Sequence, residues 1–71
     1  MTVIEAFAFN VRMTLTKKRW TQIKLAEESG INYHSLNGIL CGNNGPSLYT
    51  AYAISEALGV TLDELTEGAD E

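Results

Sequence analysis

Apolar residues recur every three or four positions along most of the chain, which is the spacing of amphipathic helices. In the first segment these positions are Ile4, Phe7, Val11 and Leu15. Thr2 and Glu5 open this segment with the T-x-x-E spacing of a capping box, in which each side chain satisfies a free backbone N–H at the helix start. The pattern predicts a helix over 3–17. The run Lys17-Lys18-Arg19 suits the negative pole of that helix dipole.

Two shorter segments come next, each with a capping residue before it and a glycine after it. Thr21 can cap a helix over 21–29, which Gly30 ends because glycine adopts a positive φ at little cost. Asn32 can cap the next helix, over 33–41, and another glycine stops it. Both helices are therefore predicted to be short and close together in the chain.

The second half of the chain begins with its strongest loop pattern, Asn43-Asn44-Gly45-Pro46. A helix over 47–58 is predicted after it, capped by its own first residue. The apolar positions of this helix are Leu48, Ala51, Ile54 and Leu58. The T-x-x-E spacing returns at Thr61 and Glu64 and predicts a short helix over 61–66.

No segment alternates apolar and polar residues for long enough to form a strand, so the predicted fold class is all-α. A chain of 71 residues makes one domain. We expect 1–67 to form this domain and 68–71 to be an acidic, flexible tail. The single cysteine, Cys41, excludes an internal disulfide, and we expect it to be half-buried. Together with one histidine it is too little for a four-ligand zinc site, so we expect no metal and no cofactor.

Charge is distributed unevenly along the chain. The net charge of −4 argues mildly against nucleic acid as a partner. However, all five basic residues lie before position 25, and eight of the nine acidic residues lie from Glu27 onward. No Lys, Arg, Asp or Glu occurs between Glu28 and Glu56. The sequence thus has a basic front, a neutral middle and an acidic end, and we expect the acidic end to face away from any nucleic acid.

Several functional classes find no support in the sequence. The only histidine and the only cysteine, His34 and Cys41, lie on roughly opposite sides of one predicted helix, and no glycine-rich phosphate loop or pair of carboxylates occurs. We therefore expect no enzyme activity and no small-molecule ligand. No stretch approaches the roughly 20 apolar residues that span a bilayer, and the N-terminus lacks the pattern of a signal peptide. We expect a cytoplasmic protein without membrane contact.

One pattern covers the two short helices, their turn and the segments after them. It reads Thr21-Gln22-x-x-Leu25-Ala26-x-x-x-Gly30-Ile31-Asn32-x-x-x-Leu36-x-x-Ile39-x-x-Gly42, and later Pro46-Ser47-Leu48 and Ala57-Leu58-Gly59-Val60-Thr61-Leu62-Asp63-Glu64-Leu65. This spacing resembles the helix-turn-helix of Cro/repressor-type regulators, the XRE family, over roughly residues 9–66. The resemblance implies a compact five-helix bundle of the phage-repressor DNA-binding-domain type. The helices over 21–29 and 33–41 would form its helix-turn-helix.

The resemblance also implies which residues meet DNA. The helix over 33–41 would enter the major groove, and its base-reading residues would be Tyr33, His34, Asn37 and Gly38. Gln22 resembles the glutamine with which the family holds a phosphate, and free N–H groups at the start of its helix would add to that contact. The other candidates for contacts with the DNA backbone are Thr21, Arg12, Lys17, Lys18, Arg19, Lys24, Ser35, Asn43 and Asn44.

Two departures from the family pattern bear on function. The helix over 33–41 carries no Arg or Lys, which leaves polar contacts that favour A·T pairs. Leu15 and Leu40 stand where the family often has an Arg and a Glu that pair with each other. We expect these two leucines to touch and to replace the ion pair. Trp20 stands where the family commonly has Leu, and we expect it in the core or, at the start of a helix, half exposed.

The function that the resemblance implies is a sequence-specific DNA-binding transcriptional regulator, a repressor of phage, mobile-element or toxin–antitoxin type. It would bind double-stranded DNA at a palindromic operator as a homodimer. An alternative is a helix-turn-helix fold reused as a protein-interaction module. The contacts of such a module would be Tyr33, Leu40, Cys41 and Tyr52.

Overall fold

The computed structural model describes residues 1–70, which form five helices and no strand. The helices are α1 (Val3–Lys18), α2 (Gln22–Ser29), α3 (Tyr33–Leu40), α4 (Leu48–Leu58) and α5 (Leu62–Leu65). Each end lies within one residue of its predicted position. The predicted all-α fold class is confirmed, and no helix among the described residues is both long and apolar enough to cross a bilayer.

Every helix begins directly after a capping side chain. In each case a side-chain oxygen accepts a hydrogen bond from a backbone N–H of the first turn, which would otherwise have no partner. The capping residues are Thr2, Thr21, Asn32, Ser47 and Thr61. Complete capping boxes join Thr2 to Glu5 and Thr61 to Glu64, as predicted. The starts of the helices are therefore determined by local chemistry.

The end of α1 depends on a residue in an unfavourable conformation. Arg19 has a φ of 59° and is the one non-glycine residue among those described with a positive φ. This left-handed turn allows the backbone N–H of Trp20 to donate to the carbonyl oxygen of Leu15 at 3.0 Å. The chain then turns, and Trp20 packs partly buried against the core, which is the half-exposed alternative for this residue.

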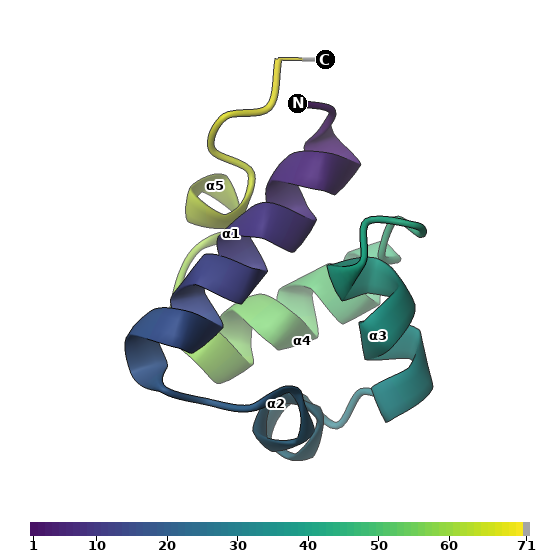
Figure 1. Ribbon diagram of the computed structural model, residues 1–71, viewed down its shortest axis with the longest axis vertical. Coiled ribbons are helices and arrows are strands. Elements are labelled where there is room, and N and C mark those ends of the chain that lie inside the picture. Colours follow the sequence, from purple (N-terminus) through teal and green to yellow (C-terminus); the bar gives the residue numbers. More distant parts are fainter. Residues whose placement is uncertain (71) are drawn as a thin grey trace.

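The helices surround one core, to which all five contribute. α1 packs on α3 and α5, α2 packs on α3 and α4, and α4 packs on α5. Figure 1 shows both chain ends at one end of the molecule, with α2 at the opposite end. The largest completely buried side chains are Leu25, Leu36, Ile54, Leu58, Leu65 and Val11. Leu15 and Leu40 belong to the same buried cluster, 7% and 5% exposed respectively.

The beginning and the end of the described chain are joined by hydrogen bonds. The amino group of Met1 pairs with the carboxylate of Asp70 at 3.0 Å, and the backbone N–H of Asp70 donates to the carbonyl oxygen of Met1 at 2.9 Å. The side-chain amide of Asn10 donates to the carbonyl oxygens of Leu65 and Glu67 at 3.0 and 2.9 Å. The division at residue 67 and the flexibility of the tail stay predictions, and residue 71 lies outside the described residues.

Two expectations about individual side chains are wrong. Leu48, predicted as an apolar position of its helix, is 79% exposed, because the first turn of α4 projects beyond the core. Cys41, predicted as half-buried, is exposed at the end of α3.

Candidate nucleic-acid interface

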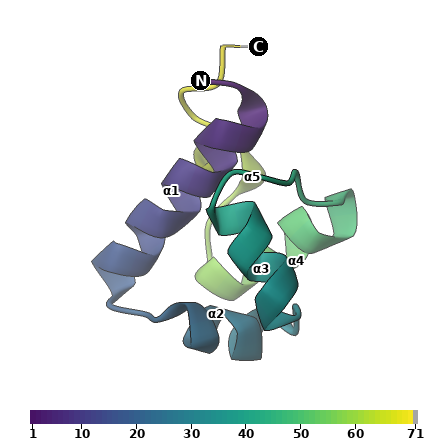
Figure 2. The same cartoon turned by 45° about the vertical axis from the view of Figure 1, so that its right-hand side comes forward.

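Helices α2 and α3 are joined by a tight turn that holds them at an angle (Figures 1 and 2). Gly30 occupies the left-handed region with a φ of 75°, and its N–H donates to the carbonyl oxygen of Ala26 at 2.9 Å. The hydroxyl of Ser29 accepts a hydrogen bond from the N–H of Ile31 at 3.2 Å. Below the turn, Leu25 and Leu36 are completely buried. The turn and this shared core fix the direction in which α3 projects.

The two sides of α3 differ completely in character. Leu36, Ile39 and Leu40 are buried. The opposite side exposes polar and aromatic side chains, namely Tyr33, His34, Ser35 and Asn37. The rings of Tyr33 and His34 meet edge to face with their centroids 6.0 Å apart. Three of the four predicted base-reading residues therefore share one exposed surface at the start and middle of α3.

A hydrogen bond links this surface to the start of α2. The side-chain Nε2 of Gln22 donates to Oδ1 of Asn37 over 3.4 Å. Gln22 is the first residue of α2, directly after the capping Thr21, whose hydroxyl already accepts from the N–H of Lys24. The predicted phosphate-binding residue and a predicted base-reading residue are therefore in direct contact. This contact orients both amides, and the sequence pattern did not reveal it.

Gly38, the fourth predicted base-reading residue, lies under another side chain. A Cβ atom at Gly38 would stand 2.6 Å from Nδ2 of Asn44, so the missing side chain makes room for the Asn44 amide. The loop is held there because the N–H of Asn43 donates to the carbonyl oxygen of Gly38 at 3.1 Å. A glycine inside a helix costs about 1 kcal/mol of stability relative to alanine. Its presence at position 38 was therefore the signal in the sequence that another group approaches the helix closely there. The structure thus brings Asn44 to the exposed side of α3.

The guanidinium of Arg12, predicted to contact the DNA backbone, donates to the carbonyl oxygen of Leu40 at the end of α3. This carbonyl belongs to the last turn of the helix, where acceptors lack intrahelical partners. Arg12 thus holds one end of α3 from the neighbouring helix α1.

The other basic residues divide between two sides of the molecule. The ammonium groups of Lys18 and Lys24 lie 5.1 and 5.5 Å from the ring centroid of Trp20. Lys24 also pairs with Glu28 at 3.2 Å, four residues further along α2. Lys17 lines a hollow with Glu64, on the side of α5. Lys24 and Lys18 therefore flank Trp20, whereas Lys17 belongs to the acidic side.

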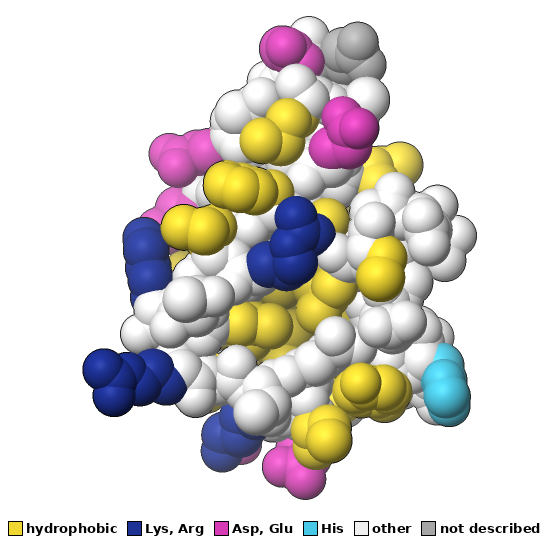
Figure 3. All heavy atoms as spheres, viewed as in Figure 1, with side chains coloured by type: hydrophobic (Ala, Val, Ile, Leu, Met, Phe, Trp, Pro, Cys, Tyr) yellow, Lys and Arg dark blue, Asp and Glu magenta, His cyan; other side chains and the backbone are white. Residues whose placement is uncertain are grey.

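The acidic residues of the last segment gather at the end of the molecule that holds both chain ends. Figure 3 shows most acidic side chains of that face at this end, with Lys and Arg lower on the same face. The acidic residues described on and after α5 are Asp63, Glu64, Glu67 and Asp70. Of the other acidic residues described, Glu27 and Glu28 lie on α2, Glu56 on α4 and Glu5 on α1. The exposed side of α3 contains no charged side chain.

The chain is similar to known proteins in sequence pattern and in fold. A family model described as helix-turn-helix matches residues 11–65, which is more than half of the chain. The restriction-modification controller protein C.AhdI from Aeromonas hydrophila has a similar structure, with a TM-score of 0.81, 27% identity, and coverage of 87% of this chain and 94% of that chain. The hypothetical transcription factor NHTF from Neisseria has a TM-score of 0.84, 23% identity, and coverage of 90% and 74%. A comparison with curated sequences gave no match.

Proposed function

Because the chain belongs to the XRE-type helix-turn-helix family of DNA-binding transcription regulators, we propose that it is a sequence-specific repressor that reads the major groove with α3. The observation that carries this proposal is the hydrogen bond between Gln22 and Asn37, which joins the start of α2 to the exposed side of α3. A regulator needs both parts in one rigid unit, since backbone contacts position the protein and base contacts specify the sequence.

Asn37 is the centre of the proposed base contact. Its Oδ1 has two lone pairs, and the Gln22 amide uses one of them. The second lone pair can accept from N6 of an adenine while Nδ2 donates to N7, which is the bidentate pairing of Asn with adenine. His34 can donate to a guanine acceptor, and Tyr33 can pack on a thymine methyl group. The absence of Lys and Arg from α3 favours A·T-rich half-sites.

Contacts to the DNA backbone come from two places in this proposal. At the start of α2, the Gln22 side chain and the N–H groups of its first turn face a phosphate, helped by the positive pole of the helix dipole. Beyond the C-terminal end of α3, Asn43 and Asn44 hold a second phosphate. Thr21, Ser35 and the cations of α1 and α2 are further candidates.

We propose a homodimer on a palindromic operator, because the electrostatic attraction between one chain and DNA is weak. Five cations serve the whole chain, and Arg12 and Lys24 already have intramolecular partners. Two to four phosphate contacts per chain correspond to a slope of log K against log salt of about −2 to −4. Two chains on half-sites about one helical turn apart double this slope and provide useful affinity.

The setting that we propose is a phage, a mobile element or a toxin–antitoxin pair. The likeness to a restriction-modification controller protein supports a regulator of this kind, since that structure covers nearly the same length of chain.

Selection of binding sites from random duplex DNA tests the function. We expect an enriched palindrome with A·T-rich half-sites, bound with a salt slope of about −4 to −8 for two chains. Enrichment of no motif, or binding that ignores salt, would refute the proposal. The alternative, an interaction module without DNA binding, keeps Tyr33, Cys41 and Tyr52 as exposed candidates. Leu40, the fourth contact predicted for such a module, is buried, so the prediction for this residue is wrong.

A further inference from the structure

The missing side chain of Gly38 leaves a gap on the exposed side of α3, and the amide of Asn44 fills it. A Cβ atom at position 38 would stand 2.6 Å from Nδ2 and 3.7 Å from Cγ of Asn44. Among the described residues outside α3 itself, only Asn44 comes within 4 Å of that position. Asn44 is exposed, whereas Gly38 is partly buried beneath it. The polar group that the helix lacks at this position is therefore supplied by the loop.

The end of α3 explains why the chain returns to this gap. Gly42 has a φ of 79°, so the backbone reverses there. The N–H of Gly42 donates to the carbonyl oxygen of Ile39 at 3.0 Å. The N–H of Asn43 donates to the carbonyl oxygen of Gly38 at 3.1 Å. These two bonds form the Schellman motif, which folds the residues after a helix back toward its last turn. Asn44 is the next residue, and its side chain thereby reaches Gly38.

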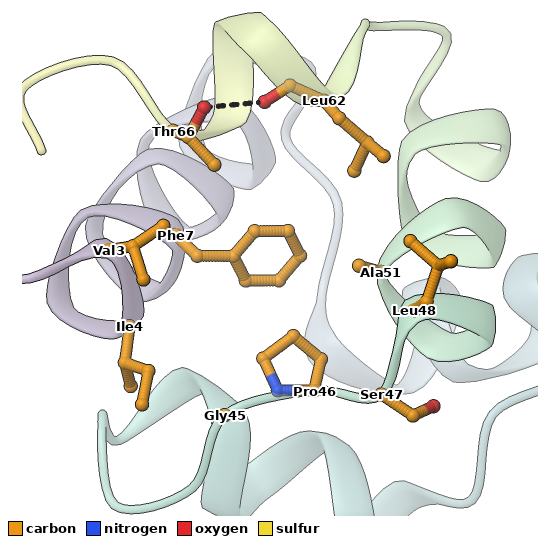
Figure 4. Close-up of a pocket in the computed structure, with 10 residues that line it drawn as sticks. All are labelled: Val3, Ile4, Phe7, Gly45, Pro46, Ser47, Leu48, Ala51, Leu62 and Thr66. Atoms are coloured by element: carbon orange, nitrogen blue, oxygen red, sulfur yellow. Dashed lines mark hydrogen bonds between the residues drawn. The ribbon is translucent and has the colours of Figure 1, made fainter.

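The loop is held from its other side by α1. A Cβ atom at Gly45 would stand 3.0 Å from Cδ1 of Ile4, so the backbone of the loop lies directly on that helix. Figure 4 shows Gly45 beside the Ile4 side chain, with Pro46 next along the chain. Proline fixes its own φ at about −65° and restricts the residue before it. Asn44 thus stands between two anchored positions, which keep its side chain on α3.

We propose that the Asn44 side chain reads a base edge in the major groove, in the place that a side chain at position 38 would occupy, and that Gly38 positions it there. The inference rests on the proposed function and adds a specificity-determining residue from outside α3. Positions 34 and 38 share one face of the helix, about 6 Å apart along its axis, which is close to two base steps of about 3.4 Å. Asn44 therefore reaches a base pair beyond the one that His34 reads.

The chemistry of the amide suits an A·T pair. An Asn side chain has an acceptor oxygen and two N–H donors, which match N6 and N7 of adenine. A phosphate presents acceptor oxygens only, so it would leave the oxygen of the amide without a partner. The phosphate beyond the end of α3 is then contacted by the side chain of Asn43 and by the main chain of the loop. The two neighbouring asparagines thus have different roles, which single substitutions can separate.

Selection of binding sites with the variants Asn44→Ala and Asn43→Ala distinguishes these roles, because each variant removes one exposed amide from the same loop. We expect the unaltered chain to prefer adenine at one position of each half-site by about 5- to 100-fold over the other bases. Asn44→Ala should reduce that preference to less than about twofold and leave the rest of the motif intact. Asn43→Ala, the matched control, should weaken binding to all sequences and keep every preference.

Gly38→Ala tests the positioning role without altering the amide itself. The added methyl group takes the space of Nδ2, and the amide swings away because it ends a flexible side chain. We expect the same loss of preference as in Asn44→Ala and no further loss in the double variant. The melting temperature should equal or exceed that of the unaltered chain, since alanine favours a helix. In the free protein, nuclear Overhauser effects should join the Asn44 amide protons to the α-protons of Gly38, and Gly38→Ala should abolish them.

Two results would overturn the inference alone and leave the proposed function standing. In the first, Asn44→Ala weakens binding to all duplexes as Asn43→Ala does, so that the amide contacts only the DNA backbone. In the second, Gly38→Ala keeps the full base preference, so that position 38 does not place the amide. If the unaltered chain enriches no motif at all, the proposed function fails, and the base-reading role of Asn44 fails with it.

Discussion

The guanidinium of Arg12 on α1 donates a hydrogen bond to the carbonyl oxygen of Leu40, the last residue of α3. The bond joins the first helix to the end of the proposed recognition helix. The side chain of Leu40 is meanwhile buried in the same cluster as Leu15. Where the family often has an Arg–Glu pair, this chain therefore has two buried leucines. The guanidinium of Arg12 instead donates a hydrogen bond to a backbone carbonyl oxygen.

Replacing Arg12 should weaken the attachment of α3. A hydrogen bond to a charged group contributes about 1.5–3 kcal/mol when buried, and the exposure of Arg12 lowers this to about 1 kcal/mol for Arg12→Met. Urea denaturation measures the change. Lys17→Met, an equal loss of charge on another side of α1, is the control and should change the free energy of unfolding by less than about 0.5 kcal/mol. Equal effects of both variants would show that Arg12 acts only through its charge.

A charge at Leu15 should be strongly destabilising. Leu15 is 7% exposed in a cluster of apolar side chains, so the guanidinium of Leu15→Arg would be buried without a partner. We expect a loss of about 3–5 kcal/mol in thermal or urea unfolding, compared with less than about 1.5 kcal/mol for Leu15→Met. Adding Leu40→Glu should recover part of the loss, because the two charges then pair. If the double variant loses as much unfolding free energy as the two single variants together, the idea that these two positions touch is contradicted.

The contact between Gln22 and Asn37 should couple affinity and specificity. Asn37→Ala should relax the preference at one base pair, and His34→Ala should do so at another. Gln22→Ala should weaken binding to all sequences, and through the lost hydrogen bond it should also relax part of the Asn37 preference. Fluorescence anisotropy on selected and random duplexes should give a coupling energy of about 0.5–1.5 kcal/mol in the double-mutant cycle. Thr16→Ala on α1 is the control, since its hydroxyl bonds only within its own helix. Additive losses of binding free energy would show that Gln22 and Asn37 act independently.

The capping box of α5 should make stability depend on pH. The backbone N–H of Thr61, and then its hydroxyl, donate to the carboxylate of Glu64 and hold the pKa of Glu64 below its ordinary value. A carboxyl group whose folded pKa is lowered stabilises the fold above its unfolded pKa, and this contribution is lost as the pH falls through the folded pKa. Glu64→Gln should therefore reduce the loss of stability in acid, as followed by chemical denaturation at several pH values. Glu67→Gln, with the same change of charge, should leave the acid loss closer to that of the unaltered chain.

Relief of backbone strain at Arg19 should be measurable. The left-handed conformation costs a residue with a side chain roughly 1–2 kcal/mol, and glycine is free of this cost. Arg19→Gly should thus be more stable than Arg19→Ala by about 1 kcal/mol, although both remove the same charge. The pair also isolates the role of the charge in DNA binding, because the salt slope should change equally in both. A glycine variant less stable than the alanine variant would mean that the conformation is not strained.

The sequence by itself determined the features that depend on neighbours in the chain. Capping side chains such as Thr2 and Asn32 lie within three residues of the N–H groups they satisfy, so the spacing alone locates the helix starts. The buried positions of α3 followed from helical periodicity, which places Leu36 and Ile39 on one side and His34 and Asn37 on the other.

Only the tertiary structure decided the contacts between residues far apart in the chain. The same periodicity assigned Leu48 to the core, but the helix projects past its neighbours there and leaves that side chain in water. The bond from Arg12 to Leu40, the Asn44 amide over Gly38 and the bond from Gln22 to Asn37 all join different segments. A pattern of residue types carries no angle or distance between helices, and these contacts exist because one small core holds α1, α2 and α3 in a single arrangement.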